Sequence, residues 1–179
     1  MFLCSKNINP KTTIGVQRIS LMSCLVTILS YIISFEIFTS IFGNVFTDNH
    51  FIFFVIALIF IYPLHKALHV LPYLHKSKSF IVQQTNKNKW LPIFNIRLNH
   101  PVKKHTFILS LLLPFMIISV ITISCAILLP SYAHYFLFIF SVNLGISLID
   151  FIYLNYVYKA PKDCFVEERK HGFEVLIKA

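Results

Sequence analysis

Charge is scarce in this 179-residue chain, because only 13% of its residues are Asp, Glu, Lys or Arg, against roughly 25% in soluble domains. Glycine and proline are also few, at 4 and 8 residues, which excludes collagen-like and low-complexity classes. Apolar residues make up 56% of the sequence, and its mean hydropathy is +0.72. A soluble globule of this length would expose much of that apolar surface, and disorder requires low hydrophobicity. The composition therefore indicates an integral membrane protein.

Cysteine pairing is missing as well. The four cysteines (Cys4, Cys24, Cys125 and Cys164) include no Cys-x-x-Cys pair, so the sequence suggests neither a disulfide framework nor a cysteine zinc site. Acidic residues number 7 against 16 Lys and Arg, giving a net charge of +9. No RNA-binding, zinc-finger or helix-turn-helix pattern accompanies this charge, so we expect no nucleic-acid partner. Basic loops that set membrane topology and face anionic lipid explain the charge better.

What the sequence does have is four long apolar runs. Each is long enough for a helix to cross about 30 Å of hydrocarbon, and too continuous for a barrel strand. They span residues 19–42, 51–71, 106–129 and 132–156. We predict an all-α fold with four transmembrane helices in a single membrane domain, residues 1–179. The first run is too long for a signal peptide, so we expect it to stay as a membrane helix.

Positive charge predicts the orientation of these helices. Residues 1–18 carry three Lys or Arg, the loop 72–105 carries seven and the tail 157–179 carries five, whereas the two other connections carry none. This bias places both termini and the large loop in the cytoplasm of a multi-pass cell-membrane protein. In the loop, residues 91–97 read as extended, and the loop would lie on lipid or fold against the helices. In the tail, two strand-like segments about a turn at 169–172 predict a short β-hairpin.

Five ionisable residues lie in or at the ends of the apolar runs, where charge is costly and often functional. They are Glu36, His65, Lys66, His69 and Asp150. His65 and His69 have the His-x-x-x-His spacing that puts two imidazoles on one helix face, where both can reach one metal ion. Zinc commonly takes a carboxylate as a third ligand. His75 is off this face and is a poor alternative ligand.

Depth in the membrane singles out the carboxylate. Asp150 lies 18 residues into the fourth run, and His65 and His69 lie 14 and 18 residues into the second. Both runs lead inward, so all three residues reach a similar depth near the cytoplasmic face. Glu36 lies 17 residues into the first run, which leads outward, and therefore belongs to the outer half. The Glu36 carboxyl could reach the membrane surface by snorkelling, could be protonated and hydrogen-bonded to a neighbour, or could relay protons.

Several segments after residue 50 resemble a family of small bacterial membrane proteins classed as zincin-like peptidases, themselves similar to site-2-type intramembrane metalloproteases. The segments that carry the resemblance are 65–69, 103–114, 143–150 and 160–176. It implies that His65 and His69 are metal ligands, that Asp150 is the third ligand and that the metal is zinc. Lys66 departs from the family pattern, because the zincin motif H-E-x-x-H has glutamate there.

That departure decides the functional hypothesis. The motif glutamate acts as the general base for the attacking water, and a charged lysine cannot accept that proton. We therefore expect a peptidase-related protein that has lost catalysis and binds another membrane protein or peptide between the second and fourth helices. Three alternatives stay open. They are an active zinc peptidase with an atypical base, a small transporter using Glu36 and Asp150, and a plain salt bridge between Asp150 and Lys66.

Overall fold

Four long helices dominate the computed structural model, which describes residues 2–8, 10–44, 46–76, 80–84, 94–98, 101–169 and 172–178. They are α2 (Val16–Phe42), α3 (Phe51–Leu68), α4 (Lys104–Leu128) and α5 (Ala133–Tyr158). Each belongs to a helical segment long and apolar enough to cross a membrane. The predicted all-α class with four such helices is confirmed. In the second of these segments the α-helix α3 ends at Leu68, and the membrane-capable segment continues to Leu74 through the 3-10 helix η1 (Leu71–Lys76).

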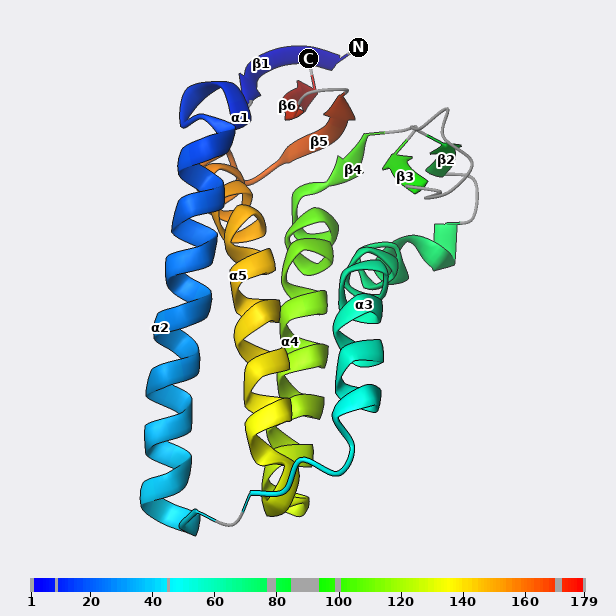
Figure 1. Ribbon diagram of the computed structural model, residues 1–179. Coiled ribbons are helices and arrows are strands. Elements are labelled where there is room, and N and C mark those ends of the chain that lie inside the picture. Colours follow the sequence, from blue (N-terminus) through cyan, green and yellow to red (C-terminus); the bar gives the residue numbers. More distant parts are fainter. Residues whose placement is uncertain are drawn as a thin grey trace.

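The four helices run side by side, with α5 between α2 and α4, and α3 packs against both α4 and α5 (Figure 1). A close approach joins α2 to α5 at Gly145, where an added Cβ would lie 2.0 Å from Thr27 Oγ1. The Ser23 hydroxyl donates a hydrogen bond to the Gly145 carbonyl across the same contact. Small residues at such a crossing let two helix backbones approach closely. The residues on α5 are consequently covered from both sides.

Short elements gather at the end of the bundle where both termini lie (Figure 1). A four-stranded antiparallel sheet has the order β1-β6-β5-β4. Its strands are β1 (Phe2–Ile8), β6 (Gly172–Lys178), β5 (Cys164–Arg169) and β4 (Val102–Lys103). The predicted hairpin is confirmed as β5 and β6. The pairing of β1 with β6 was not predicted, because it joins residues at opposite ends of the chain and leaves no local pattern.

The remaining short elements lie in the connections. They are α1 (Pro10–Thr13), η1 (Leu71–Lys76), β2 (Phe80–Gln84), β3 (Phe94–Leu98) and η2 (Pro130–Tyr132). β2 and β3 form a separate antiparallel pair. The extended segment expected at 91–97 is seen from Phe94 onward, and residues 91–93 lie outside the described part. The described part of the large connection therefore includes a strand pair.

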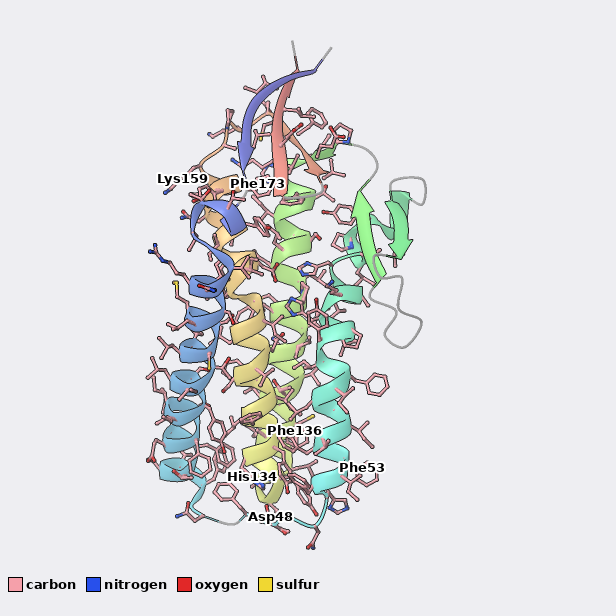
Figure 2. All side chains as sticks on the ribbon, turned by 45° about the horizontal axis from the view of Figure 1, so that its top comes forward. Asp48, Phe53, His134, Phe136, Lys159 and Phe173 are labelled. Carbon is pink, nitrogen blue, oxygen red and sulfur yellow. The ribbon has the colours of Figure 1, made fainter. Side chains whose placement is uncertain are left out.

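An apolar core fixes the sheet to the helix ends. Phe173 and Val166 of the sheet are almost fully buried and pack with Phe107 of α4 and Val157 of α5. Phe173 lies between the strands and the helix ends in Figure 2. Burial in the same cluster raises the pKa of the Cys164 thiol, which keeps that thiol protonated and unreactive. The sheet thus closes the end of the bundle toward which α3 carries its histidines.

Candidate metal centre

Three side chains from two helices converge near the sheet end of the bundle. His65 lies in the last turn of α3, and His69 caps that helix one turn later. Their Nε2 atoms lie 3.0 and 3.5 Å from the same oxygen, Asp150 Oδ2 of α5. One ligand atom from each of the three residues lies within 4.8 Å of the others. The side chains that the sequence singled out as a metal site are therefore brought together.

The opposite nitrogen of each imidazole is held by an oxygen acceptor. His65 Nδ1 lies 3.0 Å from Asn143 Oδ1, and His69 Nδ1 lies 2.8 Å from the carbonyl oxygen of Ser110 on α4. The Ser110 hydroxyl in turn donates to the His69 carbonyl at 2.7 Å. A metal-ligating histidine usually donates its second ring N–H to an oxygen in this way, which fixes the ring and its tautomer.

The orientation of the Asn143 amide follows from its other contacts. Its Nδ2 donates to the Phe115 carbonyl at 3.4 Å and to the Ser119 hydroxyl at 3.3 Å, both on α4. The amide oxygen is left facing His65, and an amide oxygen only accepts hydrogen bonds. His65 must therefore carry its proton on Nδ1. A carbonyl oxygen likewise requires the His69 proton on Nδ1.

This proton arrangement has an electrostatic consequence at the centre of the site. With both Nδ1 atoms protonated, each neutral imidazole presents the bare lone pair of Nε2 to the Asp150 carboxylate. Each of these lone pairs faces the anionic Oδ2 atom of Asp150, at 3.0 and 3.5 Å, and is repelled by it. A positive charge between them removes the repulsion. Either one divalent cation or additional protons on the imidazoles can provide it.

The donor set fits zinc. Zinc binds imidazole nitrogen and carboxylate oxygen at about 2.0–2.2 Å, so neighbouring ligand atoms of a tetrahedral site lie about 3.3 Å apart. The His65–Asp150 and His69–Asp150 separations of 3.0 and 3.5 Å bracket this value. His65 and Asp150 are buried, whereas the His69 side chain keeps 25% of its surface exposed. Three ligands with one accessible side resemble catalytic rather than closed structural zinc sites.

Lys66 takes no part in this cluster. Its Nζ lies 5.0 Å from the centre of the Tyr62 ring, one turn earlier on α3. The alternative of a salt bridge between Asp150 and Lys66 is wrong, because the Asp150 carboxylate faces the two imidazoles instead. Among the residues that the structure describes, His65, His69 and Asp150 are the one group arranged to share a metal. The side chain of His75 lies outside the described residues.

Glu36 lies elsewhere. It is exposed on α2, six residues before that helix ends at Phe42, whereas Asp150 lies eight residues before α5 ends at Tyr158. The ends of α2 and α5 lie at opposite ends of the bundle (Figure 1). The two carboxylates that supported a transporter therefore do not lie together. The supporting residues Asn143, Ser110 and Ser119 were missed as functional positions. A signal existed for Asn143, because Asn143, Ser147 and Asp150 have the i, i+4, i+7 spacing of one helix face.

Comparison with known proteins decides the family. A family model described as "Putative zincin peptidase" matches residues 58–165, more than half of the chain. The chain belongs to this family. No curated protein and no solved structure matches. The zincin-peptidase match includes His65, His69 and Asp150, and membership of a zincin family points to zinc as the metal for which these ligands are arranged. The family and the four apolar helices together indicate a membrane protein related to peptidases.

Proposed function

We propose that this protein keeps the zinc site of a membrane metallopeptidase and has lost the hydrolytic step, so that it binds a membrane partner instead of cutting it. The observation that carries the proposal is the contrast within one helical turn of α3. The imidazoles of His65 and His69 converge on Asp150. The position after the first histidine, where the motif has its glutamate, is occupied by Lys66, whose ammonium lies over the Tyr62 ring. The ligand set is present and the base is replaced.

The chemistry of the missing step explains this conclusion. When bound, zinc would polarise a carbonyl and lower the pKa of water. Hydrolysis also needs a carboxylate close by to take the proton of the attacking water and deliver it to the leaving amine. The Asp150 carboxylate contacts the two imidazoles, and Glu36 lies near the end of α2, away from them. Lys66 offers an ammonium, which has no proton acceptor at neutral pH.

An active peptidase with an atypical base is the second candidate, because the supported ligands fit a catalytic zinc site as well as a non-catalytic one. Asn143 and Ser110 hold both imidazoles in the tautomer that metal binding needs. The two candidates make the same prediction for zinc content and opposite predictions for hydrolysis.

The test compares wild type, Lys66→Glu, Lys66→Gln and His65→Ala in detergent or nanodiscs, with zinc measured by mass spectrometry. We expect about one zinc per chain in the first three proteins and a large loss in His65→Ala. We expect cleavage of an unstructured membrane-anchored reporter only in Lys66→Glu, with Lys66→Gln as the control for removal of the charge. Chelator-sensitive cleavage by wild type would overturn the proposal in favour of the second candidate. Wild type with under about 0.1 zinc per chain would overturn both.

Partner binding is tested separately. We propose that a segment of another membrane protein or peptide lies between α3 and α5 on the accessible side of His69. A photoreactive amino acid at position 70, beside His69, is expected to form an adduct that disappears in His65→Ala. The same label at position 53 is the control, because Phe53 is exposed in the first turn of α3, at the end of the helix opposite His65 (Figure 2). Equal adducts from both positions, or no effect of His65→Ala, would contradict this site of binding.

A further inference from the structure

One face of α2 carries a regular apolar stripe that nothing in the bundle covers. Met22, Leu25, Leu29, Ile32 and Glu36 follow one another at spacings of three, four, three and four residues. Such spacing lines up side chains in the seam of a helix pair. The four apolar members keep 44–57% of their surface exposed, and the structure buries only Ile19 and Phe38 of α2. Figure 1 shows α2 at the margin of the bundle, with α5 on one side.

The last member of this stripe is charged. Glu36 is exposed, and hydroxyls of Thr39 and Ser40 donate to its backbone carbonyl and not to its carboxylate. Within the described part of the chain, no ion pair or hydrogen bond satisfies that carboxylate. The sequence offers no cation at this level either, because no Lys or Arg occurs in residues 19–65 or 105–158.

Depth makes an unpaired carboxylate costly there. Glu36 lies 17 residues after Ile19, which is about 26 Å along the helix at 1.5 Å per residue. This distance falls inside a hydrocarbon layer of about 30 Å, near its outer edge. Ionisable side chains at such depths almost always face the bundle interior or a partner. Here the side chain faces outward from its own bundle, so the partner must come from outside.

We infer that this face of α2 docks a transmembrane helix of another protein that carries a Lys or Arg near its outer end. The apolar members pack against that helix, and Glu36 pairs with its cation and fixes the register. A second copy of the chain fits less well. In parallel it places Glu36 opposite Glu36, and in antiparallel orientation it reverses the charge bias that sets the topology. This inference goes beyond the proposed function and does not depend on the metal site.

The experiment uses the full-length protein with a donor fluorophore on a C-terminal tag, reconstituted into vesicles of neutral lipid. The probe is a synthetic 25-residue Leu/Ala transmembrane peptide with one Lys in its outer third and an acceptor fluorophore. Matched peptides carry Leu in place of that Lys, or carry the Lys in the inner third. Protein variants are Glu36→Gln and, on the covered side of the same helix, Ser34→Gln.

We expect the outer-Lys peptide to associate about fivefold or more tightly than either matched peptide, which is the scale of a polar contact between membrane helices. Glu36→Gln should remove that advantage, and Ser34→Gln should keep it. Equal association of all three peptides would overturn the inference and show that Glu36 reaches the headgroups unaided. A donor–donor signal from protein alone that Glu36→Gln leaves intact would also overturn it, because the face would then bind a second copy.

Discussion

At the scale of single residues, the interior of this apolar bundle is organised by polar atoms that find partners. Ser141, Ser147 and Thr122 each donate to a carbonyl one turn earlier on their own helix, which satisfies the hydroxyl locally. Asn143 differs, because it joins α5 to both α3 and α4. A buried amide with partners on two other helices is a strong constraint on how those helices pack.

Removal of Asn143 should therefore weaken metal binding without removing a ligand. In Asn143→Leu, the Nδ1–H of His65 loses its acceptor, and the ring is free to change tautomer or rotate. We expect zinc affinity to fall by about 10- to 100-fold, measured by competition with a fluorescent chelator. Ser147→Ala on the same face is the control and should bind zinc as wild type does. An unchanged affinity in Asn143→Leu would show that His65 is held without this contact.

Two neighbouring lysines offer a second residue-scale test. Lys104 is buried, and its Nζ donates to the carbonyls of Tyr158 and Ala160 at the end of α5, at 3.0 and 2.6 Å. Lys104→Met leaves both carbonyls without this donor and removes a cation from a helix C-terminus, so we expect a loss of about 1–3 kcal/mol in unfolding free energy. Lys103 is exposed, and Lys103→Met should change stability by about 0.5 kcal/mol or less. Denaturant unfolding in detergent would show equal effects if Lys104 were unimportant.

At the scale of elements, the contact between α2 and α5 depends on one missing side chain. A Cβ at Gly145 would lie 2.0 Å from Thr27 Oγ1 and 3.0 Å from the Ser23 carbonyl oxygen. Glycine is about 1 kcal/mol worse than alanine inside a helix, so propensity alone would favour alanine at this position. The close approach of the two helices is the physical reason for glycine there.

Gly145→Ala should consequently destabilise the protein, by about 1–3 kcal/mol, despite its better helix propensity. The effect should shrink when Thr27→Ala removes the hydroxyl that the new methyl group meets. A double-mutant cycle of these two changes measures the coupling directly. If Gly145→Ala alone were stabilising, the backbones of α2 and α5 would have to be farther apart than the structure shows.

At the scale of the whole molecule, the distribution of basic residues and the position of the sheet agree. Both termini and the connection between α3 and α4 lie at one end of the bundle, and the short loop after α2 lies at the other (Figure 1). Asp48 of that loop accepts hydrogen bonds from Tyr135 and pairs with His134 at the start of α5 (Figure 2). This loop carries no Lys or Arg.

The positive-inside rule then predicts the outcome of reporter fusions in a bacterial host. Alkaline phosphatase, which is active only outside the cytoplasm, should be active when fused after Thr47 and inactive when fused after residue 179. A fluorescent protein that matures in the cytoplasm should show the reverse pattern at the same two sites. Phosphatase activity at residue 179 would place the C-terminus, the sheet and the candidate metal centre on the outer side.

Sequence alone predicted the four long helices and the three residues of the candidate metal centre. Long uncharged runs can only become helices in a bilayer, because every backbone polar group must be satisfied within the segment. The spacing of His65 and His69 places them on one face by helical periodicity, and the depth of Asp150 follows from counting residues along two runs that lead toward the same end of the bundle. These are properties of neighbours along the chain, so a single sequence contains them.

Tertiary structure decided what depends on contacts between distant segments. The rotation of α5 against α3 decides whether Asp150 faces the imidazoles or Lys66. The face of α2 that meets Gly145 decides that the Glu36 side chain is exposed. The pairing of β1 with β6 joins the two ends of the chain. Rotation and pairing of this kind arise from packing among several elements at once. Local spacing limits the choices, and only the assembled bundle selects one.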